Sequence, residues 1–143
     1  MKIKQQKQIK AFLAESFGND RGGKLFEMQD KALGEIIGNT KGKTENQMKT
    51  LIQTILPRIA LYKSFIAAGL SDDDVYKYMR KYMLEIVAAK KHSSTVKMEI
   101  VPGFYAIYSR VFLKIMRTTD LQESVQEHGK DYFNVTITKC LWH

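Results

Sequence analysis

The sequence has little of what marks a secreted or membrane-spanning protein. It contains a single cysteine in 143 residues, Cys140, so no disulfide can form within the chain. Its basic start, Met1 to Lys7, is not followed by the apolar core of a signal peptide. The longest uncharged stretch lies between Glu99 and Arg110 and is far shorter than the roughly 20 residues of a membrane-spanning helix. We therefore expect a cytoplasmic protein that does not cross a membrane.

The composition is that of an ordinary globular domain. A chain of 143 residues fits one domain, and 44% hydrophobic with 27% charged residues excludes a disordered chain. The charge is unbalanced, with 23 Lys+Arg against 15 Asp+Glu and a formal net charge of +8. A positive field favours anionic partners, which include nucleic acid, acidic lipid and small carboxylates. It does not choose among them.

Apolar residues at helical spacing predict five helices. Their apolar faces fall within Ile3–Phe17, Leu25–Ile37, Met48–Ile66, Val75–Ile86 and Phe104–Ile115. We expect the glycine-containing segment from Gly18 to Gly23 to break the chain between the first two. The fourth helix should fray near Lys90–His92, where cations suit the negative end of its dipole.

Local signals mark the middle of the chain most clearly. Thr44 and Gln47 have the spacing of a capping box, in which each side chain binds the backbone N–H of the other residue. Pro57 lies inside the apolar run that follows, which predicts a kink or two abutting helices. Gly69 suits the C-terminal cap of that run, and Ser71 suits the N-cap of the next helix.

The fifth helix and the segment after it differ from the rest. Pro102 is expected to begin this helix, whose apolar residues surround it so broadly that it should be buried on nearly all sides. After Asp120 the period changes, and Tyr132–Cys140 alternates apolar with polar residues as a β-strand does. The only weak upstream partner for this strand is Val96–Val101.

A lone strand leaves backbone groups on both edges without partners. We expect the strand to pair with Val96–Val101, with a second copy or with a sequence absent here, and we favour the last. The predicted fold class is therefore mostly α, with about five helices in a bundle-like array and a C-terminal β-strand. It becomes α+β if missing or partner strands complete the sheet. We expect one helical domain, 1–143, in which 131–140 is a strand of an incomplete sheet.

No motif predicts a metal or a cofactor. The loop Gly38–Thr44 resembles a phosphate-binding loop but has one residue too few between its glycines and follows a helix. Asp72–Asp74 suits the first turn of a helix and needs no metal. Cys140 and His143 have a C-x-x-H spacing, half of a zinc site, without a second pair. Taken alone, a cysteine at a strand end is more often a small buried residue than a nucleophile.

Basic residues do not form a recognisable nucleic-acid module. Lys77, Arg80 and Lys81 lie on the fourth helix among acidic residues, a pattern more typical of a solvated face. A nucleic-acid partner is therefore not expected.

Two segments resemble a known family. Ile55–Lys63, followed by Gly69–Ser71, and the strand Phe133–Cys140, which ends in Ile-Thr-x-Cys, are similar to the L-2-amino-thiazoline-4-carboxylic acid hydrolases. Between these segments the similarity is one of helical layout only. In that family the chain continues after the matching cysteine into further cysteines and a Cys-Asp-Phe type ending, and none of these is present here.

The resemblance implies a hydrolase that opens a sulfur-containing ring by C–N/C–S cleavage, here a truncated member and inactive as it stands. Cys140 is then the candidate catalytic nucleophile, attacking the amidine-like carbon of the ring, or else a structural cysteine. Arg58, Lys63 and Tyr62 are candidate ligands of a small carboxylate substrate. The alternative is a non-catalytic helical interaction domain that pairs through its C-terminal strand, forming a homo-oligomer. No cofactor is expected in either case.

Overall fold

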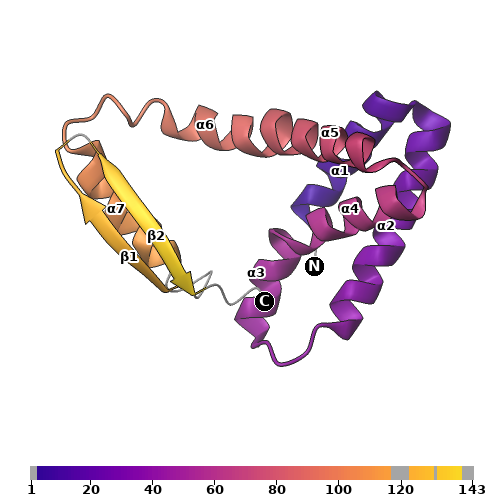
Figure 1. Cartoon of the computed structure of the whole chain (residues 1–143), viewed down its shortest axis with the longest axis horizontal. Coiled ribbons are helices and arrows are strands. Elements are labelled where there is room, and N and C mark those ends of the chain that lie inside the picture. Colours follow the sequence, from indigo (N-terminus) through magenta and orange to yellow (C-terminus); the bar gives the residue numbers. More distant parts are fainter. Residues whose placement is uncertain (1–2, 117–122, 131, 140–143) are drawn as a thin grey trace. The chain divides into compact units, whose positions relative to one another are not determined.

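A computed structural model describes residues 3–116, 123–130 and 132–139. The chain is mostly helical and carries a small antiparallel sheet near its C-terminus, which confirms the predicted fold class (Figure 1). The chain divides into two compact units, residues 1–89 and 90–143, which are described separately below. Within the described residues, none of the helices combines the length and hydrophobicity needed to cross a membrane.

The described residues of the first unit form helices and no strand. Its elements are α1 (Lys4–Phe17), α2 (Asn19–Asn39), α3 (Glu45–Gln53), α4 (Leu56–Ala67), α5 (Asp72–Lys81) and the π-helical segment η1 (Tyr82–Ala88). The helix α6 (Ala89–Thr95) continues directly from η1, so the expected fraying near Lys90–His92 is wrong. Helices α1 and α4 both pack on α2, and α5 packs on α4.

The local helix signals are confirmed. Thr44 accepts a hydrogen bond from the Gln47 backbone N–H (3.3 Å), and the Thr44 N–H donates to Gln47 Oε1 (2.8 Å). Pro57 separates α3 from α4 and lies in the first turn of α4. Gly69 ends α4 with a left-handed φ of 75°, and Ser71 Oγ caps α5 by accepting from the Asp74 N–H.

The turn between α1 and α2 is shorter than expected. The predicted break over Gly18–Gly23 is confined to Gly18, whose φ is 78°, and α2 begins at Asn19. Gly22 lies inside α2 because the backbone of α1 passes too close for a side chain. A Cβ atom there would lie 2.5 Å from the carbonyl oxygen of Leu13.

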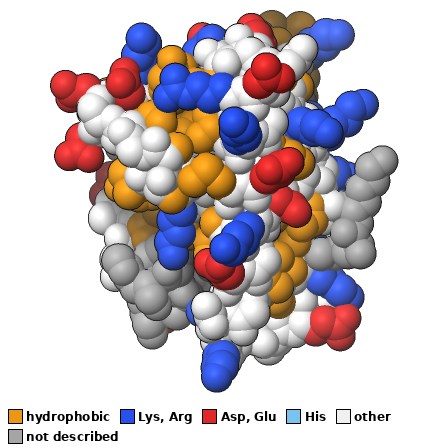
Figure 2. Space-filling view, turned by 90° about the vertical axis from the view of Figure 1, so that its right-hand side faces the viewer, with side chains coloured by type: hydrophobic (Ala, Val, Ile, Leu, Met, Phe, Trp, Pro, Cys, Tyr) orange, Lys and Arg blue, Asp and Glu red, His pale blue; other side chains and the backbone are white. Residues whose placement is uncertain are grey.

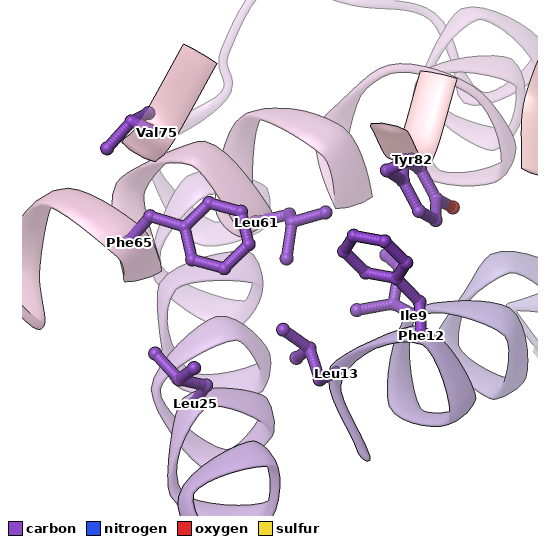
Figure 3. Close-up of a cluster of buried hydrophobic side chains, with 8 residues drawn as sticks. All are labelled: Ile9, Phe12, Leu13, Leu25, Leu61, Phe65, Val75 and Tyr82. Carbon is purple, nitrogen blue, oxygen red and sulfur yellow. The ribbon is translucent and has the colours of Figure 1, made fainter. Parts of the chain in front are cut away.

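The core of this unit is formed where α1, α2, α4 and α5 meet. Its fully buried side chains include Leu13, Leu61 and Phe65 (Figure 3). The ring of Tyr82, the first residue of η1, meets Phe12 edge-on at 5.3 Å between ring centres. Burial of these apolar side chains is the main force that holds the helices together.

The second unit combines α7 (Phe104–Ile115) with a hairpin of β1 (Glu123–His128) and β2 (Phe133–Lys139). Helix α7 follows Gly103 rather than starting at Pro102. The expectation that it is buried on nearly all sides is wrong, because Ile107 and Val111 are 50% and 54% exposed.

The partner of the C-terminal strand is β1, within the chain. The favoured expectation of a partner absent from this sequence is therefore wrong, and so is the expectation that only Val96–Val101 could pair with the strand upstream. The two strands are antiparallel, with Gln126 opposite Val135 and Val125 opposite Thr136. Val96–Val101 forms turns instead. The sequence of β1, Glu-Ser-Val-Gln-Glu-His, contains only one apolar residue and so gives no hydrophobic alternation to detect.

The two faces of the hairpin differ in polarity. Phe133 meets Phe112 of α7 at 6.2 Å between ring centres, so Phe133, Val135 and Ile137 lie on the helix side. Thr136 and Val125 lie on the opposite, exposed face. Figure 1 shows α7 along one face of the hairpin.

Candidate functional site

The break between α3 and α4 creates a polar cluster. Pro57 has no N–H, so the carbonyl of Gln53 loses the hydrogen bond that a continuous helix would give it. The side chain of Gln5, from α1, replaces it: Nε2 donates to the carbonyl oxygens of Gln53 (2.6 Å) and Thr54 (2.7 Å). The buried backbone at the break is therefore satisfied by a side chain distant in sequence.

Gln29 of α2 supports the same break from the other side. Its fully buried amide donates to the carbonyl of Pro57 (3.2 Å) and exchanges two hydrogen bonds with Gln6 (2.9 Å each). Gln6 also donates to Asp30 (2.9 Å). Because these amides are fully paired, they fix α1 and α2 against the start of α4.

Arg58 and Tyr82 meet at the carboxamide oxygen of Gln5. Arg58 Nε donates to this oxygen over 3.2 Å, and the Tyr82 hydroxyl donates to it over 3.4 Å. Partial burial lowers the pKa of Arg58, while burial raises the pKa of Tyr82 to about 12 against the opposing effect of the Arg58 charge. No carboxylate among the described residues forms an ion pair with Arg58.

A groove between α4 and α5 lies one helical turn from this cluster. It has a volume of about 360 Å³ and is lined by Tyr62 of α4 and by Asp72, Val75, Tyr76 and Met79 of α5. Tyr62 and Tyr76 are 49% and 70% exposed. Asp72 is the only charged side chain in the lining, so the groove is apolar with an acidic end.

The apolar surface extends along α4 beyond the groove. Ile59, Tyr62 and Ile66 lie at positions i, i+3 and i+7, so they share one face, and Ile59 and Ile66 are 38% and 44% exposed. The face in Figure 2 likewise carries orange apolar patches between interleaved basic and acidic side chains. Such interleaving is typical of a solvated surface rather than of a phosphate-binding stripe.

The predicted site residues are distributed as follows. Arg58 is half-buried in the polar cluster, Tyr62 lines the groove, and Lys63 is exposed and does not line it. Cys140, the candidate nucleophile, lies outside the described residues. Among the described residues, no group of histidine, cysteine and acidic side chains could hold a metal ion.

The sequence did not indicate Gln5 and Gln29 as residues of this cluster. A glutamine on an amphipathic helix carries no periodic signal, and its role here follows only from the position of the Pro57 break. Pro57 could have indicated such a partner. It leaves the carbonyl of Gln53 without its helical hydrogen bond, so this carbonyl needs a donor from another part of the chain. No family model, curated protein or solved structure matches the chain.

Proposed function

We propose that the chain is a helical interaction domain that binds an apolar helical segment of a partner protein in the α4–α5 groove. The observation that carries this proposal is the row of exposed Ile59, Tyr62 and Ile66 beside Tyr76. Scattered exposed apolar residues are normal, but a contiguous patch built around tyrosines is typical of an interface. An amphipathic helix fits such a groove through apolar residues at i, i+4 and i+7.

The acidic end of the groove adds a charge preference. Asp72, Asp73 and Asp74 occupy the first turn of α5, and Asp72 lines the groove. A partner helix with Lys or Arg at the matching end would gain a favourable electrostatic contact, whereas an acidic residue would be repelled. The proposed ligand is thus amphipathic and basic at one end.

The test is a selection of displayed helical peptides on the full chain. We expect enriched peptides to have the apolar spacing and a basic end, and to bind Tyr62→Ala at least about tenfold more weakly, as truncation of an interface tyrosine does. Ile107→Ala, an exposed apolar residue on α7, is the matched control and should bind unchanged. Enriched peptides that bind both variants equally would contradict the proposal.

A second candidate function is a hydrolase for a small carboxylate substrate, as the family resemblance implies. The observation that favours it is the half-buried Arg58, a cation with no acidic partner among the described residues. A carboxylate bound there would supply the missing countercharge, and the Tyr82 hydroxyl lies beside the same Gln5 oxygen.

Binding is the sharper test of this second candidate, because the family's further cysteines are absent from the sequence. Titration calorimetry with 2-amino-thiazoline-4-carboxylate should show binding that Arg58→Gln abolishes and Lys63→Gln leaves intact. Cys140→Ser should retain binding and lose any ring opening. Equal heats for the parent chain and Arg58→Gln would exclude Arg58 as the anchor.

A further inference from the structure

The two edges of the β1–β2 hairpin differ in charge. In the seven residues of β2 the only ionisable residue is Lys139 at its end, whereas β1 carries Glu123, Glu127 and His128 within six residues. Charged side chains on an edge strand oppose pairing with another strand, and an uncharged edge permits it. Among the described residues, β2 pairs on one side only, with β1.

Apolar side chains next to the β2 edge are incompletely covered. Ile137 lies on the helix side of the hairpin yet is 50% exposed, while Phe133 and Val135 are half-buried. A third strand beside β2 would cover this surface, and a two-stranded hairpin is at best marginal without one.

We infer that the occupant of this edge is β2 of a second copy, related by a twofold axis. Pairing of β1 with its own copy would gather two carboxylates from each chain along one seam, whereas β2 with β2 gathers none between Phe133 and Thr138. The product is a four-stranded antiparallel sheet with strand order β1–β2–β2–β1. It deepens the proposed interaction function with a second surface, which shares no residue with the groove.

The register follows from the faces of the strand. In an antiparallel pair, opposite residues point to the same face, and a one-residue slip would set Val135 beside Thr136 of the other copy. Val135 therefore meets Ile137 of the other copy, and this register places Thr136 opposite itself. Thr136 is also the midpoint of β2, so the overlap of the two strands is greatest there. Both α7 helices then lie on the same face of the sheet.

Two substitutions separate this arrangement from its alternatives. Thr136→Lys sets two cations opposite each other at the axis and should weaken the dimer by up to about fivefold, because like charges directly opposite each other destabilise a strand pair. Val125→Lys is the matched control, since Val125 is 60% exposed on the same face but lies on β1. An equimolar mixture of Thr136→Lys and Thr136→Glu should form the mixed dimer in preference to either pure one.

The measurement is sedimentation equilibrium of the full chain at physiological ionic strength, because two copies of net charge +8 repel each other at low salt. Spin labels in a Cys140→Ser background give the register. With strands about 4.8 Å apart, backbones at position 136 should be about 5 Å apart and those at position 125 about 14 Å.

The outcomes are distinct. A dimer weakened by Thr136→Lys and not by Val125→Lys, with the shorter distance at position 136, supports the inference. A monomer at all concentrations, or a shorter distance at position 125, overturns it. Neither result alters peptide binding by the groove, so failure here and failure of the proposed function are distinguishable.

Discussion

At the scale of single residues, Gln5 does the most to join distant parts of the chain. One carboxamide binds two backbone carbonyls at the α3–α4 break and accepts hydrogen bonds from Arg58 and Tyr82. Gln5 is only 8% exposed, so water cannot replace these hydrogen bonds. The positions of Arg58 and Tyr82 in the polar cluster therefore depend on Gln5, a residue without an ionisable or nucleophilic group.

Replacement of Gln5 by Leu should lower the free energy of unfolding by about 2–4 kcal/mol, because buried carbonyls lose their donor. Gln8→Leu is the matched control, since Gln8 lies on the same helix and makes no side-chain hydrogen bond with the described residues. Urea unfolding followed by circular dichroism measures both variants. Equal losses would show that hydrogen bonding by Gln5 is not the cause.

Tyr82 should make stability depend on alkaline pH. Burial raises its pKa from the ordinary value near 10 to about 12, so above pH 10 the unfolded chain releases this proton while the folded chain retains it. The stabilisation is complete below pH 10 and is lost as the pH rises toward 12, with a slope of at most about 1.4 kcal/mol per pH unit.

Tyr82→Phe should remove this part of the alkaline slope. Tyr76→Phe should keep it, since the Tyr76 side chain is 70% exposed. Unfolding free energies between pH 9 and 11.5 test the difference. If the two variants lose stability in parallel, another group is responsible for the slope.

At the scale of whole elements, the contact of α1 with α2 depends on Gly22. A Cβ atom at this position would meet the backbone of Leu13 and Ala14 at 2.5–2.9 Å, and backbone atoms cannot move aside as a side-chain tip can. Gly22→Ala should therefore destabilise the chain by about 2–3 kcal/mol through overpacking.

Gly34→Ala is the control in the same helix. Nothing lies within 4 Å of a Cβ atom there, so the helix should gain about 0.5–1 kcal/mol because alanine loses less backbone entropy. Thermal unfolding should show a lower melting temperature for Gly22→Ala and a higher one for Gly34→Ala, because only Gly22 lies against the backbone of α1. A stabilising Gly22→Ala would show that α1 and α2 lie farther apart.

The same elements explain how far the sequence could predict the fold. Thr44, Pro57 and Ser71 act through neighbours within four residues, so their helix boundaries were predicted correctly. β1 was missed because its polar residues match no strand pattern, and it is a strand only because β2 and α7 lie beside it. The π-helical segment η1 was likewise not predicted, since Val75–Ile86 follows ordinary helical spacing.

The candidate site shows the same division between local and distant causes. Tyr62 and Arg58 lie close together because they are four residues apart on one helix, which the sequence alone could indicate. Tyr76 and Met79 complete the groove from another helix, and Gln5 and Tyr82 complete the polar cluster from far along the chain. Spacing within one helix cannot predict such partners.

At the scale of the whole molecule, the buried apolar residues are distributed unequally between the two units. Of those identified among the described residues, all except Met116 belong to residues 1–89. Local stability follows buried apolar contact, so the two units should not open with the same free energy.

Amide hydrogen exchange should reveal this difference. We expect amides of α1, α2 and α4 to exchange slowest and those of the β1–β2 hairpin at least about tenfold faster in dilute protein, a gap of about 1.4 kcal/mol in opening free energy.

Because the dimer would cover the outer edge of β2, raising the protein concentration should slow exchange in β2 more than in β1 and leave α1 unchanged. A hairpin protected as strongly as α1 at low concentration would contradict the unequal stability. Exchange in β2 that does not depend on concentration would contradict the twofold pairing while leaving the first conclusion intact, since one effect belongs to a single chain and the other to two.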